Sequence, residues 1–151
     1  MLDVDHFKSY NDEFGHPAGD EILKLFAVVV ASSLRLSDLS GRIGGEEFAA
    51  LLPCSLDEGV IVADRIRRAF EGSNIVCDEG AVDTTVSIGV AGGPAGTELE
   101  VLLAAADTAL YQAKRTGRNK VEAAEELPLS LEHWRRKSAG AADAGRKPKL
   151  A

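Results

Sequence analysis

Apolar residues recur at helical spacing in three stretches of the chain, which predicts three helices. The first covers residues 20–34, where acids occupy the first turn and interact favourably with the helix dipole. The other two cover residues 55–70 and 97–115. Each opens on Ser55 or Thr97 followed three residues later by Glu, the signature of a capping box.

Short apolar runs between these helices predict the strands. Residues 83–91 are β-branched and alternating, and residues 120–122 form a last short strand. A tight turn at residues 44–47 (GGEE) joins residues 42–43 to residues 48–53, and its paired glycines are expected to supply positive φ. The order is strand end, helix, hairpin, helix, strand, helix, strand. It predicts an α/β (α+β) sandwich in which helices cover a mixed sheet.

Composition and charge narrow the class of protein. The chain has 151 residues, 45% of them hydrophobic, which is enough for one domain with a core. Its 24 acids and 17 bases give a net charge of −7, which argues against binding nucleic acid or anionic membrane through a basic face. It has no run of about 18 apolar residues and no signal-peptide pattern, so we expect a cytoplasmic protein without a membrane segment.

The charge also divides the chain unevenly. Residues 1–121 carry 19 acids and 11 bases (net −8), whereas residues 122–151 carry 5 acids and 6 bases (net +1) and are rich in Ala, Gly and Pro. We therefore expect one domain at residues 1–122 and a mostly disordered tail at residues 123–151.

Two pairs of carboxylates are the first candidates for chemistry. Asp3 and Asp5 flank Val4 at a strand end, and alternate residues on a strand share a face. Carboxylates that converge in this way are typical of a magnesium site, although many such pairs bind no metal. Glu46 and Glu47 form a second pair on the glycine turn, where their repulsion favours a bound cation or an acid–base role.

Short motifs follow one another along the first 122 residues: DVDHFK (3–8), ND (11–12), GH (15–16), GD (19–20), GGEEF (44–48), SIGV (87–90), AD (106–107), ALY (109–111) and KRTGRN (114–119). Together they resemble the GGDEF family of diguanylate cyclases in its GGEEF spelling. The resemblance implies the fold of polymerase palms and class III nucleotide cyclases. It also implies the condensation of two GTP molecules into cyclic di-GMP with release of pyrophosphate.

The resemblance further implies a metal site at the two acidic motifs. Asp3, the backbone carbonyl of Val4 and Glu46 would bind two Mg²⁺ ions per site, which Mn²⁺ could replace. Glu46 would also accept the proton of the attacking hydroxyl, and Glu47 would assist. The two ions would lower the pKa of the 3′-hydroxyl and neutralise charge at the α-phosphorus.

Substrate recognition is implied by position as well. Asn11 and Asp20 would bind the guanine edge, an amide and a carboxylate facing its acceptor and donors. The phosphates would be held by the backbone amides of His6 and Phe7, by the turn at Gly44 and Gly45, and by the cations Lys8, Lys114 and Arg118. The alternative for each cation is an ordinary solvated residue at a helix end.

A second site is implied by Arg35-x-x-Asp38, which lies five residues before Gly44 and matches the inhibitory RxxD motif of the family. There the product would bind through arginine stacking and phosphate pairing, with Arg65 as a further cation. An ordinary salt bridge at a helix end is the alternative. A symmetric product also implies a homodimer, since each domain holds one GTP.

The start of the chain departs from the family pattern. The family domain begins with an additional helix and a full first strand, of which only Met1 and Leu2 are present. The loss is expected to expose strand edges and reduce core burial. Two hypotheses follow: an active diguanylate cyclase, or a non-catalytic GTP or cyclic di-GMP binding module, including an inactive fragment of a larger signalling protein.

Overall fold

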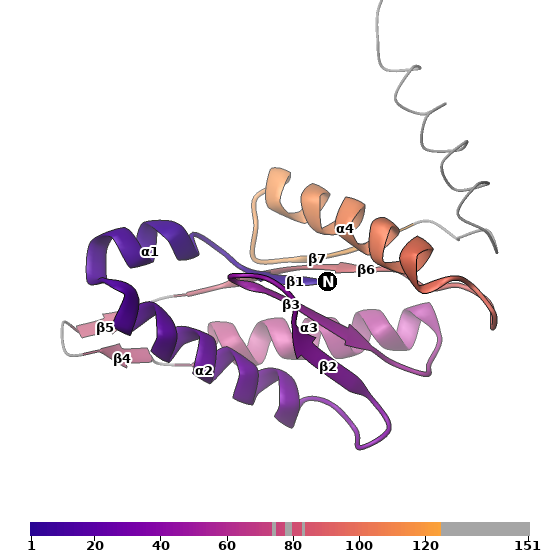
Figure 1. Ribbon diagram of the computed structural model, residues 1–151, viewed down its shortest axis with the longest axis horizontal. Coiled ribbons are helices and arrows are strands. Elements are labelled where there is room, and N and C mark those ends of the chain that lie inside the picture. Colours follow the sequence, from indigo (N-terminus) through magenta and orange to yellow (C-terminus); the bar gives the residue numbers. More distant parts are fainter. Residues whose placement is uncertain (74, 78–79, 83, 125–151) are drawn as a thin grey trace, which may run out of the picture.

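The computed structural model of the protein describes residues 1–73, 75–77, 80–82 and 84–124 (Figure 1). The predicted tail therefore lies outside the described residues from 125 onward. The elements follow in the order β1 (Leu2–Val4), α1 (Phe7–Phe14), α2 (His16–Ser32), β2 (Leu39–Arg42), β3 (Glu47–Leu51), α3 (Leu56–Glu71), β4 (Ile75–Cys77), β5 (Gly80–Val82), β6 (Val86–Val90), α4 (Leu99–Arg115) and β7 (Val121–Ala123).

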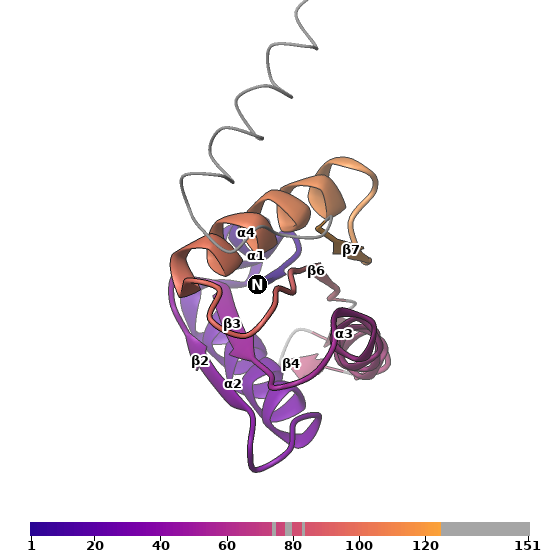
Figure 2. The ribbon, with the colours of Figure 1, turned by 90° about the vertical axis from the view of Figure 1, so that its right-hand side faces the viewer.

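Five strands form the main sheet in the order β2-β3-β1-β6-β7, and β4 pairs with β5 in a separate ribbon. Neighbours in the sheet are antiparallel except for β6 and β7, which are parallel. Helix α4 covers one face, and α2 and α3 cover the other (Figures 1 and 2). This is the mixed, helix-covered sheet that the hydrophobic pattern predicted.

The core lies between β1, β3, β6 and the helices α2 and α3. Three aromatic rings hold its centre: Phe26 on α2 lies 4.9 Å from Phe48 on β3 and 4.7 Å from Phe70 on α3, between ring centroids. Ring pairs at this spacing add to the energy of apolar burial. The packing fixes α2 and α3 against the strands that carry the acidic motifs.

The predicted capping box of α3 is confirmed. The Glu58 backbone N–H donates to Ser55 Oγ at 3.3 Å, and the Ser55 backbone N–H donates to the Glu58 carboxylate at 2.9 Å. The second predicted box, at Thr97, is wrong. There the N-cap is Glu98, without a side-chain cap, and the Thr97 hydroxyl donates to the carbonyl of Pro94 at 2.7 Å.

Helix α2 begins at His16, four residues before the predicted start. Gly15 at φ 83° separates it from α1, and Pro17 occupies its first turn, where a missing N–H costs nothing. Two further elements, α1 and the β4–β5 ribbon, were not predicted from the sequence. Helix α1 consists mostly of polar residues and buries only Phe7 and Tyr10, so its apolar pattern is weak.

The hairpin differs from prediction in two details. Its tip is Ile43–Glu46, because Glu47 is already paired as the first residue of β3. The expected positive φ is absent from both glycines of the turn. A Cβ at Gly44 would come within 2.6 Å of the end of the flexible Glu47 side chain, and a Cβ at Gly45 would meet nothing within 4 Å, so neither glycine is required by space in the protein alone.

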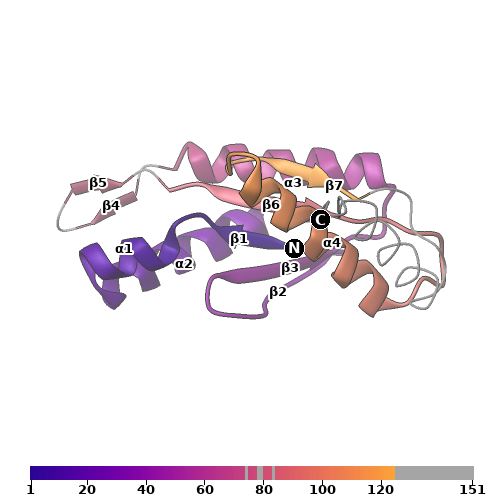
Figure 3. The same cartoon turned by 90° about the horizontal axis from the view of Figure 1, so that it is seen from above.

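Strand β1 is short but central, and its three residues are buried. Figure 3 shows β1 and the N-terminus between β3 and β6. The pairing of β1 with β3 ends at Leu2 and Phe48, although β3 continues to Leu51. Beyond Met1 lies an apolar cavity of about 390 Å³ that β3, β6, α3 and α4 line. The core is thus open at the place where a longer first strand would run.

Among the described helices, none combines the length and the apolar character needed to cross a membrane.

Candidate active site

The end of β1 brings Asp3 beside the acidic turn. Asp3 pairs in register with Glu47 on β3 and with Ser87 on β6, and it is 4% exposed. Lys114 reaches it from α4, with Nζ 2.7 Å from Asp3 Oδ2. Residues that are 111 positions apart in the chain therefore form one polar centre at the edge of the core.

Opposing effects act on the pKa of Asp3. Burial raises the pKa most, the hydrogen bond and charge of Lys114 lower it, and the nearby charges of Glu46 and Glu47 raise it again. The net pKa lies above the ordinary value. Three carboxylates, those of Asp3, Glu46 and Glu47, act on this centre together with Lys114, and this arrangement favours a bound cation.

The donor chemistry of this centre fits Mg²⁺. Asp3 and Glu46 offer carboxylate oxygens, and the predicted third ligand is the carbonyl of Val4, whose N–H donates to the Glu46 carbonyl at 3.4 Å. The described residues hold no ready-made group of three or more His, Cys, Asp or Glu side chains around a metal position. A site of two carboxylates and one carbonyl does not need such a group.

Asp5 does not join this centre, contrary to the sequence-based pairing of Asp3 with Asp5. Its carboxylate accepts hydrogen bonds from Thr85 Oγ1 and Ser87 Oγ, each at 2.7 Å, and from the Asn119 N–H at 3.1 Å. These three donors occupy both oxygens. Asp5 therefore has a different role from that of Asp3.

The glycine turn is held by an arginine that sequence analysis missed. Arg42 Nε donates to the carbonyls of Gly44 (3.1 Å) and Gly45 (2.9 Å), and the Ile43 N–H donates to the Glu47 carbonyl at 2.9 Å. The bonds fix the turn that carries Glu46. Arg42 immediately precedes the glycine motif, but only the folded hairpin shows that its side chain turns back on it.

The two predicted guanine ligands lie close together. A side chain at Gly19 would collide with the amide of Asn11, so Gly19 makes room for Asn11 immediately before Asp20. Asn11 Oδ1 is buried without a hydrogen-bond partner, one of two such side-chain atoms in the described part of the chain. Asp20 lines a cavity of about 530 Å³ with Arg42 and Phe48.

The predicted phosphate ligands are distributed around the end of β1. His6 is the exposed N-cap of α1, and Phe7 follows in the first turn, where helix amides lack internal partners. Lys8 is exposed on α1. Arg118 lies outside α4, which ends at Arg115, in a turn where its φ is 59°.

These observations agree with one family. A family model described as "Diguanylate cyclase, GGDEF domain" matches residues 1–120. The chain belongs to the GGDEF family of diguanylate cyclases. Among similar proteins, the response regulator PleD of Caulobacter vibrioides is 44% identical over 125 residues, and the diguanylate cyclase DgcP of Pseudomonas aeruginosa is 41% identical over 125 residues.

Alignments to these GGDEF proteins cover most of this chain but little of the relatives. They span 80% and 82% of this chain, and 28% of PleD and 19% of DgcP. A solved GGDEF domain, that of DgcB from Caulobacter crescentus in complex with c-di-GMP, is 32% identical with a TM-score of 0.77. It covers 81% of this chain and 74% of that one. The family and its cyclase fold are therefore established for this chain.

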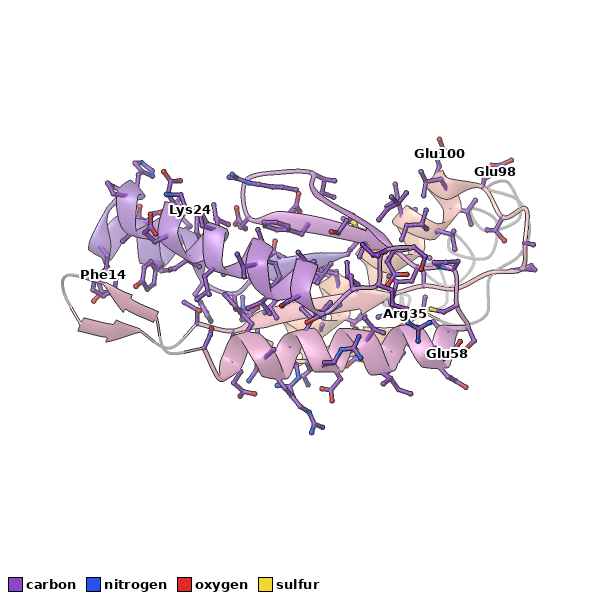
Figure 4. The ribbon with its side chains drawn as sticks, turned by 90° about the horizontal axis from the view of Figure 1, so that it is seen from below. Phe14, Lys24, Arg35, Glu58, Glu98 and Glu100 are labelled. Carbon is purple, nitrogen blue, oxygen red and sulfur yellow. The ribbon has the colours of Figure 1, made fainter. Side chains whose placement is uncertain are left out.

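The RxxD segment precedes β2, whereas the GGEEF turn lies at the other end of that strand. Asp38 accepts a hydrogen bond from the Arg35 backbone N–H at 2.8 Å, so it closes a turn instead of forming the alternative salt bridge. The guanidinium of Arg65 donates to the Ser33 carbonyl at 2.5 Å. Figure 4 shows Arg35 next to Glu58 of α3, with its side chain on the surface.

Proposed function

We propose that this domain condenses two GTP molecules into cyclic di-GMP and releases pyrophosphate. The observation that carries the proposal is the register of β1 with β3, which puts Asp3 opposite Glu47 while Lys114 contacts Asp3 at 2.7 Å. Relatives named diguanylate cyclase support the same activity. Because the chain spans less than a third of the relatives PleD and DgcP, the proposal concerns this domain.

Asp3, the Val4 carbonyl and Glu46 are proposed to hold two Mg²⁺ ions, for which Mn²⁺ can substitute. Bound ions would lower the pKa of the 3′-hydroxyl and neutralise charge on the phosphates. Glu46 accepts the hydroxyl proton, and Glu47 adds negative charge beside the same turn. Lys114 opposes the rise in the pKa of Asp3 that burial causes, and it is placed to contact the triphosphate.

Recognition of GTP follows from the remaining residues. Asn11 supplies an amide and Asp20 a carboxylate, which match the O6 acceptor and the N1–H and N2–H donors of guanine. The amides of His6 and Phe7, together with Lys8 and Arg118, are proposed to bind the phosphates. The triphosphate would cross the turn at Gly44 and Gly45.

The product has two-fold symmetry, so we propose that two copies of the domain face each other, each with one GTP. Cyclic di-GMP would also bind at a second site and inhibit the reaction. The exposed guanidinium of Arg35 is free of Asp38 and near α3, which carries Arg65. Arginine at such a position suits stacking on guanine and pairing with phosphate.

Incubation of the purified chain with GTP and Mg²⁺, followed by chromatography for cyclic di-GMP, tests this activity. We expect product from the wild type and none from Glu46→Gln, with Glu13→Gln, an exposed acid on α1, as the matched control. A folded dimer that makes no cyclic di-GMP would refute the activity.

One observation favours a second candidate, the non-catalytic binding module. An apolar cavity of about 390 Å³ lies beside Met1 and Leu2, so the core next to the strand that carries Asp3 is not fully packed. Turnover of GTP distinguishes the candidates. Both are expected to bind cyclic di-GMP with an affinity that Arg35→Ala removes, as calorimetry would show, but the binding module makes no product from GTP.

A further inference from the structure

Asp5 is a buried carboxylate that the proposed chemistry does not use. It is 5% exposed, and none of the ion pairs found in the described part of the chain includes it. A buried carboxylate is costly unless hydrogen bonds satisfy it. Two hydroxyls, those of Thr85 and Ser87, and one backbone amide, that of Asn119, do so here.

The bond from Asn119 to Asp5 joins the two ends of the domain. It links the residue after β1 to the turn between α4 and β7, 114 positions later. That turn has an unusual backbone, since Gly117, Arg118 and Asn119 have φ of 121°, 59° and 46°. Positive φ is uncommon for residues other than glycine, so the turn needs partners that hold it.

The side chain of Asn119 supplies a second attachment, to α3. Arg67 Nη1 donates to Asn119 Oδ1 at 2.9 Å, and Asn119 Nδ2 donates to the Glu71 carboxylate at 2.7 Å. The turn is therefore held from α3 by a side chain and from β1 by a backbone amide. Of these two attachments, the bond from the Asn119 amide to Asp5 is the one that connects the turn to the end of β1, the strand that carries Asp3.

We propose that Asp5 is a positioning residue of the active site. By holding the Asn119 amide, it fixes the left-handed turn that directs Arg118, and it keeps this cation in place relative to Asp3 and Lys114. The inference rests on the proposed function, since Arg118 acts there as a phosphate ligand. Asp5 itself touches neither the substrate nor the metal.

Asp5→Ala tests the proposal, with affinity for a non-hydrolysable GTP analogue in Mg²⁺ and KM for GTP as the readouts. We expect both Kd and KM to rise about tenfold, the usual cost of losing a residue that orients a ligand-binding group. Asp5→Asn should restore both, because its amide oxygen can accept from Asn119 while its NH₂ donates to the Ser87 hydroxyl.

Two matched variants separate positioning from stability. Ser87→Ala removes a bond to the same carboxylate but leaves the Asn119 contact, so it should lower the melting temperature without changing Kd. Asn119→Gly removes the side-chain bonds to α3 but keeps the amide and suits positive φ, so it should also leave Kd unchanged. A rise in Kd for Asn119→Gly that equals that of Asp5→Ala would overturn the proposal.

Amide hydrogen exchange of the wild type keeps the test decisive if Asp5→Ala does not fold. The Asn119 amide should be protected before any ligand is added, and exchange as fast as in an exposed loop would contradict the proposal. A folded Asp5→Ala chain with unchanged Kd and KM would do the same. If the wild type binds the analogue but makes no product, the proposed function is refuted and the positioning role is not. The affinities of the variants for the analogue still test that role.

Discussion

Lys114 on α4 and Asp3 on β1 form the ion pair at the centre of the candidate site, with their charged atoms 2.7 Å apart. The Asp3 side chain is 6% exposed and that of Lys114 32%. Burial makes the two members unequal: loss of the lysine leaves a buried charge without its partner, which costs more than the net contribution of the pair. The stability of the fold therefore depends on the same Asp3 carboxylate that is proposed to bind the metal.

Lys114→Met should lower the free energy of unfolding by about 1–3 kcal/mol at pH 7 without added metal. The double variant Asp3→Asn, Lys114→Met should recover most of this loss, because the buried charge is then absent. Urea unfolding measures both. Lys24→Met is the control: its pair with Glu21 has the same 2.7 Å length but is exposed, so no measurable change in the free energy of unfolding is expected. Strict additivity of the two substitutions would contradict the coupling.

The two look-alike capping sequences should respond differently to mutation. Ser55→Ala removes the hydroxyl that caps α3 and should cost about 1 kcal/mol. Thr97→Ala removes a hydroxyl that contacts only the Pro94 carbonyl in this structure, so we expect a loss of less than about 0.5 kcal/mol. Thermal or urea unfolding of the two variants compares them directly, and equal losses would show that Thr97 caps α4 in solution.

This pair also shows how far local sequence determines the fold. Both stretches carry Ser or Thr and a Glu three residues later, yet α4 begins two residues after Thr97. Ser55 Oγ accepts from the Glu58 N–H, whereas the Thr97 hydroxyl donates to the Pro94 carbonyl of the preceding loop, a contact that the local pattern does not show. The long amphipathic helices were predictable from periodicity. Helix α1 was not, since it buries only Phe7 and Tyr10.

The candidate site divides in a similar way. Asp3, Glu46 and Lys114 are predictable from the sequence, because each lies in a motif that resembles the family's. The partners of Asp5 could not be predicted, because Thr85, Ser87 and Asn119 reach it only when β6 pairs with β1 and β7 pairs with β6. Strand pairing over 80 to 114 positions creates this network, and no local pattern indicates it.

Two glycines should separate packing from ligand binding. A Cβ at Gly89 would collide with the backbone of Ala106 and Leu110 on α4, so Gly89→Ala should cost about 3 kcal/mol or more. A Cβ at Gly45 meets nothing, so Gly45→Ala should fold like the wild type, with a change within about 0.5 kcal/mol. If the triphosphate crosses this turn, Gly45→Ala should still weaken binding of a GTP analogue by about tenfold or more, as calorimetry would show. Unchanged affinity would place the phosphates elsewhere.

The amino group of Met1 should make stability depend on pH. It donates to the Gly89 carbonyl at 3.0 Å inside the sheet, and burial lowers its pKa from 8.0 to about 6. Between these values the unfolded chain binds more protons, so stability should rise with pH across the window from 6 to 8, by about 3 kcal/mol in total. Below pH 6 the desolvation cost is fully present. Acetylation of the amino group should abolish this rise, and a pH profile that acetylation leaves unchanged would assign it to other groups.

An apolar extension placed before Met1 should stabilise the domain by filling the cavity of about 390 Å³. In the register of β1, added residues would run between β3 and β6, antiparallel to both. Helices α3 and α4 line the cavity, so side chains of either parity would meet an apolar wall.

Ile-Val-Leu-Val is a suitable extension, and Gly-Ser-Gly-Ser is its matched control. Both remove the ammonium group from its buried position, but only the first supplies apolar side chains. We expect Ile-Val-Leu-Val to raise the melting temperature by about 5 °C or more over the control, since burial of even two such side chains is worth about 3 kcal/mol. Differential scanning calorimetry measures the difference. Equal melting temperatures would mean that the cavity closes by local rearrangement and does not accept a strand.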